Sequence, residues 1–335
     1  MILQNCKTHL FWATAIIFSL AFTKYYYLLT HEFHPPSFSE NIADFNADKV
    51  FQKRFLIPVC ANILSSNLGL HFDTTLKSIS FIATLGLILG FSKLIMKISE
   101  RQITPYWSLI LFIPVTWNYM LLNSIYHSYD IPALAFYCIG LWLFLDKKYF
   151  IYYFVFFIGT FNRESTCLIT LTAAIISINC DSSRDIKRFY LNNKILITHI
   201  LIQALVWVLL TQYLKFLVKD NTGQLYEHTF SMLKFMSDAW QGNPSWPFLQ
   251  TELFFGNPRS LITIFAGIWI FIPFLWKYIP MGAKRSLWLF PIYMIPAISY
   301  ANLMESRVYH ELNIILALVL VSGLSNYFSK GKLTT

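Results

Sequence analysis

Charged residues are scarce in this sequence of 335 residues, because Asp, Glu, Lys and Arg together make up only 13% of it. A soluble domain carries about 25% charged residues. Apolar residues make up 56% and the mean hydropathy is +0.51. The apolar residues come in blocks of about 20, which is the length of a transmembrane helix. This composition argues against a soluble protein and predicts an integral membrane protein.

Signatures of several common sites are also missing. The five cysteines show no paired spacing, so no disulfide framework is expected. There is no Walker loop, no G-x-S-x-G element and no dinucleotide-binding fingerprint. His31 and His34 have no neighbours that would complete a metal site, so no metal ligands are predicted. The net charge of +9 is spread through short loops, as topology signals are, and predicts no nucleic-acid partner.

The apolar blocks predict an all-α fold, a polytopic bundle of about 10 transmembrane helices (range 9–11). Residues 1–335 form a single membrane domain in this interpretation. The first block is expected to be an uncleaved helix, because its apolar run continues through Tyr25–Leu29. The expected spans are 8–28, 77–97, 106–122, 130–145, 149–161, 166–179, 195–217, 259–279, 287–303 and 309–325.

Basic residues orient this bundle. With both termini in the cytoplasm, the inner segments hold 15 of the 26 Lys and Arg residues but only four of the 17 acids. This is the asymmetry that the positive-inside rule describes. Six of the eight histidines and 13 of the 17 acids then lie outside. The outer face is therefore the predicted working surface.

Two parts of the predicted topology are irregular. The first outer loop, 29–76, contains the short apolar stretch Phe55–Leu64, which we interpret as an interfacial or re-entrant helix. The segments 149–161 and 166–179 are short for two spans, and one long helix interrupted at Asn162–Ser165 is the competing interpretation. The charge pattern favours two spans. A second long outer loop is expected at 218–258.

The first outer loop carries the candidate catalytic residues. Asp44 or Asp48 could act as a general base toward a bound hydroxyl at the membrane surface. Arg54 could pair with one of them or hold a phosphate. The competing interpretation is an ordinary solvated loop.

Three further polar groups fall at outer span ends. His127 and Asp130 open the fourth span, where Asp130 would also serve as a helix N-cap. Arg163 and Glu164 lie between two apolar stretches, where ionisable residues are costly and mark either a functional cavity or a buried structural pair. Between the last two spans stand Glu305, Arg307 and Glu311, of which the last two could simply pair at i and i+4.

Together these groups suggest a lipid-linked phosphosugar as the substrate. Arginines suit a phosphate or pyrophosphate, and carboxylates suit a hydroxyl acceptor that must lose a proton. A polyprenyl-phosphate-linked sugar combines a phosphate with a lipid tail that resides in the bilayer. The residue types therefore predict glycosyl transfer at the outer face, to an acceptor that the sequence does not identify.

The layout resembles the GT-C class of polyprenyl-phosphate-sugar-dependent glycosyltransferases, over about residues 1–325. It is most similar to bacterial members with an Arg-Glu-Ser/Thr element mid-chain and a Glu-x-Arg element late. The matching residues are Arg54-Phe-Leu-Ile-Pro, Tyr129-Asp130, Asn162-Arg163-Glu164-Ser165, Glu305-Ser306-Arg307 and Glu311-Leu312.

The resemblance implies a bacterial inner-membrane enzyme with juxtamembrane helices and a catalytic acid in the first outer loop. Asp44 and Asp48 are the positions that could match this acid, although the loop lacks the adjacent acidic pair of some members. The implied reaction is an inverting transfer in which Arg54, Arg163 or Arg307 stabilises the departing phosphate. The glutamates would orient these arginines or bind sugar hydroxyls, and His127 and Asp130 would also contact substrate. No cofactor is predicted, and participation of a divalent metal ion stays open.

Two other classes of function stay open. A transporter or flippase for a lipid-linked or anionic solute would use the same arginines. It would also need polar residues deep on both sides, and His199 is a rare polar residue in the inner halves of the spans. A non-catalytic membrane assembly subunit is the third interpretation.

Overall fold

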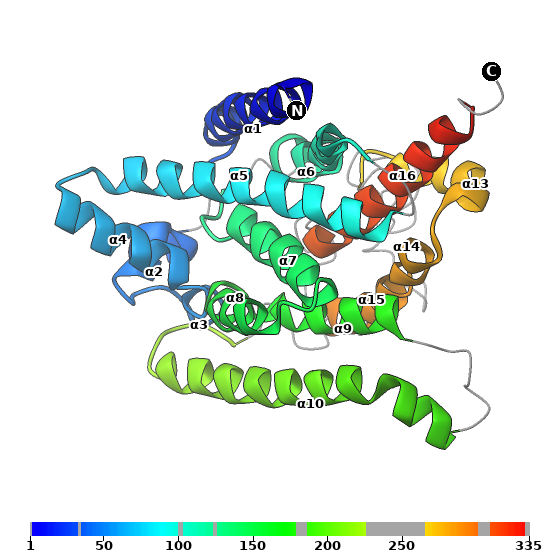
Figure 1. Ribbon diagram of the computed structural model, residues 1–335. Helices are drawn as coiled ribbons and strands as arrows, with labels where there is room; N and C mark the ends of the chain where they lie inside the picture. Colours follow the sequence, from blue (N-terminus) through cyan, green and yellow to red (C-terminus); the bar gives the residue numbers. More distant parts are fainter. Residues whose placement is uncertain are drawn as a thin grey trace, which may run out of the picture.

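A computed structural model of the chain describes residues 2–32, 35–99, 103–122, 126–178, 186–225, 265–300 and 309–331. The described elements are helical, which confirms the predicted all-α class (Figure 1). The longer helices are α1 (Ile2–Leu29), α4 (Leu56–Leu68), α5 (Phe72–Ile98), α7 (Asp130–Leu145), α8 (Tyr149–Asn162), α9 (Cys167–Ser177), α10 (Ile186–Leu217), α15 (Leu289–Tyr300) and α16 (His310–Gly331). The shorter ones are η1 (Pro35–Ser37), α2 (Ser39–Ala43), α3 (Lys49–Gln52), η2 (Pro105–Leu111), α6 (Phe112–Thr116), the π-helix η3 (Trp117–Leu122), η4 (Glu164–Thr166), η6 (Ile268–Phe271), α13 (Ile272–Leu275), η7 (Trp276–Tyr278) and α14 (Met281–Ser286).

Three helices in the described ranges are long and apolar enough to cross a membrane: Phe72–Ile98, Tyr190–Leu217 and His310–Ser329. Among the described helices, these three meet the requirements of length and hydropathy, and the predicted count of about ten spans is not confirmed. Their surroundings differ, since 78% of the apolar window of α16 is buried inside the protein and only 11% of that of α10. Helix α16 is therefore central, whereas α10 lies at the edge of the bundle (Figure 1). Many apolar side chains of α10 are exposed.

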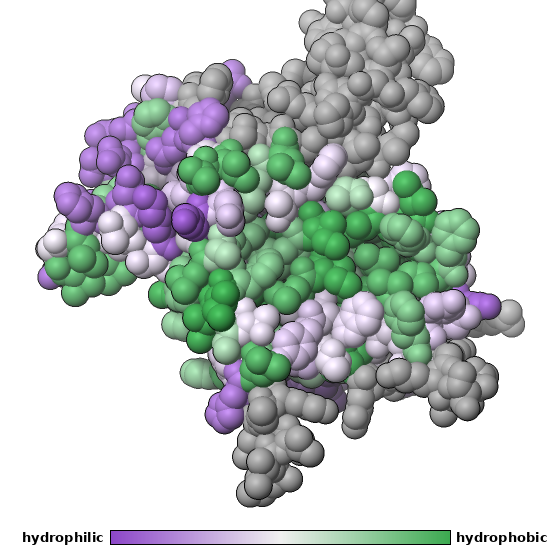
Figure 2. Space-filling model, turned by 90° about the horizontal axis from the view of Figure 1, so that it is seen from above, coloured by the Kyte–Doolittle hydropathy of each residue, from purple (hydrophilic) through white to green (hydrophobic). Residues whose placement is uncertain are grey.

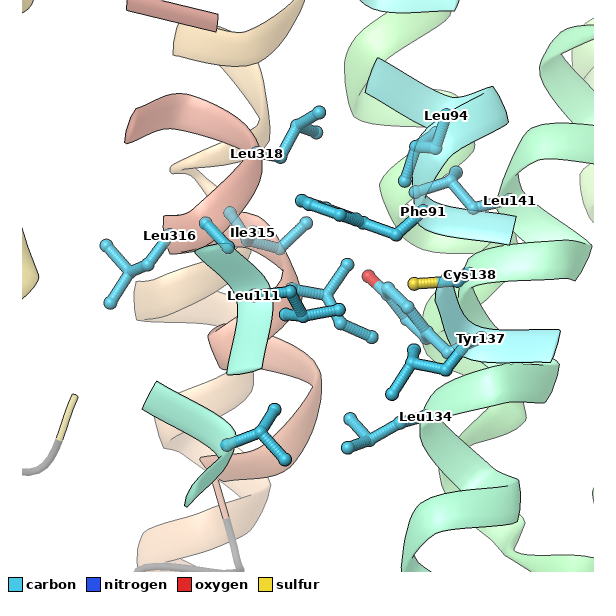
Figure 3. Packing of buried hydrophobic residues seen from close by; sticks show 14 of the residues in the cluster. Phe91, Leu94, Leu111, Leu134, Tyr137, Cys138, Leu141, Ile315, Leu316 and Leu318 are labelled. Carbon is cyan, nitrogen blue, oxygen red and sulfur yellow. The ribbon is translucent and has the colours of Figure 1, made fainter. Parts of the chain in front are cut away.

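The core forms where α5, α7 and α16 meet. Helices α5 and α7 approach closely at Gly90, where an added Cβ would lie 2.8 Å from the side chain of Ile139. From α5, Phe91 extends toward Ile315 and Leu318 of α16 (Figure 3). All three side chains are fully buried. The absence of a side chain at Gly90 thus lets two bundle helices pack backbone to backbone.

Helix ends that the sequence places outside meet at one end of the molecule. The Tyr27 hydroxyl near the end of α1 lies 3.2 Å from Ser80 Oγ near the start of α5. Beyond α10, the Thr222 carbonyl accepts a 2.9 Å hydrogen bond from Lys49 N of α3. In Figure 2, hydrophilic residues gather at the end where α4 and the beginning of α5 lie, while apolar residues cover the middle.

The chain changes direction between α8 and α9. The Tyr152 hydroxyl of α8 lies 3.2 Å from Thr170 Oγ1 of α9, and both hydroxyls donate to the amide oxygen of Gln203 on α10. The chain therefore bends between α8 and α9, and both helices contact α10. One long interrupted helix would hold Tyr152 and Thr170 far apart. Neither helix is among those long enough to cross a membrane, so the two-span interpretation of 149–179 stays a prediction.

The first outer loop contains the expected short helices. Helix α4 has 13 residues and extends beyond the predicted Phe55–Leu64 to Leu68. At 1.5 Å per residue it is about 20 Å long, too short for a hydrocarbon core of about 30 Å. It ends at Gly69, whose φ of 65° is the left-handed conformation typical of a residue that stops a helix. The second long outer loop, predicted at 218–258, lies mostly outside the described residues.

Candidate functional site

Tyr129 joins three segments that are distant in the sequence. Its ring is fully buried with Ile42, Ala47 and Phe51 of the first outer loop. Arg54 donates a 2.9 Å hydrogen bond to the Tyr129 hydroxyl, and its guanidinium carbon lies 5.0 Å from the ring centroid. The Asn162 amide at the end of α8 donates to the Tyr129 carbonyl at 3.0 Å. Tyr129 thereby holds the outer loop against the first turn of α7.

Directly after Tyr129, Asp130 forms a buried ion pair with Arg163. The two charged groups are 2.8 Å apart, with the Asp130 side chain fully buried and the Arg163 side chain 13% exposed. Arg163 can reach Asp130 because α8 ends there, and its backbone is extended (φ −162°, ψ 132°). The other carboxylate oxygen of Asp130, Oδ2, has no hydrogen-bond partner within the described part of the chain.

A second buried ion pair lies beside the first. Lys53 Nζ donates a 2.9 Å hydrogen bond to Glu164 Oε2, with the Lys53 side chain 3% exposed and that of Glu164 27% exposed. Burial lowers the pKa of Lys53, and the charge of Glu164 opposes this shift. The Trp207 indole of α10 donates to the Glu164 carbonyl at 2.7 Å. Trp207 therefore positions η4, the short helix that carries Glu164.

Glu311 places the start of the last helix, α16, next to the two ion pairs. It lies in the first turn of α16, near the side chains of Ser165 and Tyr293. His310 Nε2 lies 2.9 Å from a Glu311 carboxylate oxygen, and both side chains are buried. Sequence reasoning included Glu311, quoted Tyr129 only as part of the Tyr129-Asp130 motif, and gave no role to His310 or Lys53. Lys53 directly precedes Arg54, and this pair of basic residues was the available signal.

His127 is buried near the two ion pairs. Its ring is 3% exposed and stacks on Phe51 at 6.1 Å and on Tyr129 at 5.1 Å between centroids. Neither ring nitrogen of His127 has a hydrogen-bond partner among the described residues. Of the residues predicted to bind substrate, six therefore belong to one connected cluster, namely Arg54, His127, Asp130, Arg163, Glu164 and Glu311.

The two predicted bases, Asp44 and Asp48, lie in the first outer loop and take no part in the two ion pairs described above. Asp44 ends α2 and is exposed. Asp48 begins α3, and its Oδ1 accepts a 2.5 Å hydrogen bond from the Thr222 hydroxyl. The buried Gln52 side chain shapes this loop, because it accepts from Ala47 N and donates to Ile42 O.

An aromatic row connects the loop with the cluster. The Phe45 ring lies 5.6 Å from that of Phe55, which lies 5.7 Å from that of Phe161, measured between centroids. Glu305 and Arg307 lie outside the described residues. Over the described ranges, His, Cys, Asp and Glu form no group of three or more that could hold a metal ion.

Comparison with known proteins found no match to this chain. No protein-family model matches it, and no curated protein or solved structure matches it either. The geometry of the cluster is therefore the basis for the functional argument.

Proposed function

We propose that this chain is a membrane glycosyltransferase that moves a sugar from a polyprenyl-phosphate donor to an acceptor at the extracytoplasmic face. The observation that carries the proposal is the buried Asp130, which is paired with Arg163 through one oxygen and has a second oxygen that lacks a donor in the described residues. Buried acceptors are nearly always satisfied by protein, water or ligand. A hydroxyl of the donor sugar is the natural donor to Asp130 Oδ2.

The cations of the cluster suit the donor phosphate. Arg163 is held by Asp130, Lys53 by Glu164, and Arg54 by Tyr129. Fixed cations stabilise charge that develops in a transition state without having to reorganise. Their position at the end of the apolar bundle would allow the prenyl chain to stay in the bilayer.

The transfer itself needs few groups. The acceptor oxygen attacks the anomeric carbon, the bond from that carbon to the phosphate oxygen breaks, and polyprenyl phosphate leaves with the electron pair. The acceptor proton passes to a carboxylate, for which Asp44 and Asp48 remain our candidates. Asp44 is the more accessible of the two, because Thr222 occupies the Asp48 carboxylate. Glu305 and Arg307 stay in the proposal as donor-binding residues on the strength of the family resemblance alone.

Transport is the second candidate, and one observation favours it. Polar side chains recur along the side of α10 that contacts the bundle, where His199 contacts Tyr153, Gln203 contacts Tyr152, and Trp207 contacts Glu164. Transporters place polar groups at such depths. Packed membrane helices also use such hydrogen bonds to associate, so this observation supports the alternative less strongly than Asp130 supports transfer.

The test uses full-length protein in vesicles with a panel of polyprenyl-phosphate-linked hexoses and pentoses and an extract of envelope glycoconjugates as acceptor. Protein-dependent release of polyprenyl phosphate together with a new glycosidic bond supports the proposal. We expect Asp44→Asn to lose at least 100-fold in rate, as removal of a general base typically does. Donor movement across the vesicle membrane with no new glycosidic bond would instead favour transport.

Glu40 provides a matched control, since it is an exposed acid on α2 in the same outer loop. Glu40→Gln should keep the full transfer rate. Asp48→Asn tests the second candidate base. If transfer continues unchanged with Asp44 and Asp48 replaced both singly and together, the assignment of the base to this loop is wrong.

A further inference from the structure

A groove with two lysines runs between α1 and α5, away from the buried cluster. Its volume is about 660 Å³. Apolar side chains such as Leu20, Phe81 and Ile82 line it together with Lys24 and Lys77. Both lysines are exposed, whereas Asp73, the nearby acid in the first turn of α5, is not part of the lining.

The two lysines come from different helices that meet at the groove. Lys24 lies on α1 and Lys77 on α5, and both side chains line it. The two helices are joined there, because the Tyr27 hydroxyl contacts Ser80 at 3.2 Å and Tyr126 at 2.5 Å. Lys77 Nζ lies 5.4 Å from the Tyr27 ring centroid, within the range of a cation–π contact.

A buried hydroxyl in the groove gives independent evidence for a polar ligand. Thr14 of α1 and Thr30, the residue directly after this helix, each donate to the carbonyl four residues earlier, as helical threonines commonly do. Thr23 lines the groove, is only 7% exposed, and has no hydrogen-bond partner among the described residues. A ligand in the groove that accepts a hydrogen bond would satisfy it.

We propose that this groove binds one anionic phospholipid of the bilayer, with its phosphate between Lys24 and Lys77 and an acyl chain along the apolar lining. Lysine ammonium groups bind phosphate as point charges, and lysine stems pack well on apolar surface at the membrane interface. Charge complementarity favours a lipid with net negative charge, because the described lining contains two cations and no acid. This inference is independent of the proposed glycosyl transfer.

Native mass spectrometry of full-length protein in neutral detergent tests this inference. The probes are dioleoylphosphatidylglycerol, dioleoylphosphatidylcholine and inorganic phosphate. We expect wild-type protein to retain one phosphatidylglycerol in preference to phosphatidylcholine. The double variant Lys24→Gln/Lys77→Gln should bind phosphatidylglycerol roughly thirtyfold more weakly, which corresponds to two surface lysines at about 1 kcal/mol each. Thr23→Val should weaken binding to a smaller extent.

The double variant Lys194→Gln/Lys219→Gln is the matched control, because both lysines are exposed on or just after α10 and lie outside the groove. It should retain phosphatidylglycerol as wild type does. Equal retention of the two lipids, or full phosphatidylglycerol binding by the groove variant, would overturn the proposal. Displacement of the lipid by millimolar inorganic phosphate would overturn it too, since the groove would then recognise an anion and not a lipid.

Discussion

Replacement of Asp130 by alanine should destabilise the protein strongly, because it leaves the charge of Arg163 without its partner. The ion pair is 2.8 Å long, and the Arg163 side chain is only 13% exposed, so water can replace little of the lost interaction. Loss of one partner of a buried pair costs about 3–5 kcal/mol. We expect a value in this range for Asp130→Ala. The double variant Asp130→Leu/Arg163→Met removes both charges and should recover most of the stability.

Unfolding in mixed SDS–detergent micelles, followed by circular dichroism, measures these changes. The double-mutant cycle of Asp130→Ala and Arg163→Met should give a coupling energy of about 2 kcal/mol. Asp146 offers a comparison, because its ion pairs with Lys97 and Lys148 lie at the surface, and Asp146→Ala should have little effect. If Asp130→Ala loses no more stability than Asp146→Ala, Arg163 does not depend on Asp130 and the buried pair is not the organising contact of the cluster.

Two further predictions concern the outer loop and the core. Burial raises the pKa of Glu32, although hydrogen bonds from Ser39 oppose this shift, so the folded protein keeps a proton that the unfolded chain has already lost above pH 4.5. Its contribution to stability is therefore complete below pH 4.5 and is lost as the pH rises through the folded-state pKa. Chemical unfolding from pH 4 to 7 should show this decline in wild type and not in Glu32→Gln. Gly90→Leu should lower stability by about 1–3 kcal/mol in the same assay, because its side chain would collide with Ile139, whereas Gly86→Ala has room and should be near neutral.

The helical fold was predictable from hydropathy because each buried or lipid-facing helix needs an apolar run of its own. The break at Asn162–Ser165 was also visible as polar residues between apolar stretches. Hydropathy could not show the change of direction between α8 and α9. That change is stabilised by hydrogen bonds among Tyr152, Thr170 and Gln203, which belong to three different helices. The exact length of α4 was missed for a local reason: Gly69, and not a polar residue, ends it.

The candidate site was predictable as a set of residue types but not as a set of pairs. Arg163 was expected to pair with a carboxylate, and its neighbour Glu164 was one obvious partner. In the folded chain these adjacent residues point to different partners, Arg163 to Asp130 and Glu164 to Lys53. Such pairing depends on the extended backbone of Arg163 between two helices, which no local pattern specifies. Lys53 was overlooked because a loop lysine usually stays in solvent.

The pair of Lys53 and Glu164 allows stability to be separated from function. A buried ion pair can often be replaced by apolar side chains with no loss of stability, so stability alone gives little reason for its presence. We expect Lys53→Met/Glu164→Leu to unfold within about 1 kcal/mol of wild type, while the single variant Glu164→Leu, which takes away the carboxylate beside the buried Lys53 ammonium, should lose more stability than the double variant. The double variant should nevertheless lose donor-phosphate release in the vesicle assay, because a fixed cation near the leaving group is gone. A stable double variant with wild-type transfer would mean that Lys53 and Glu164 serve only to join the outer loop to η4.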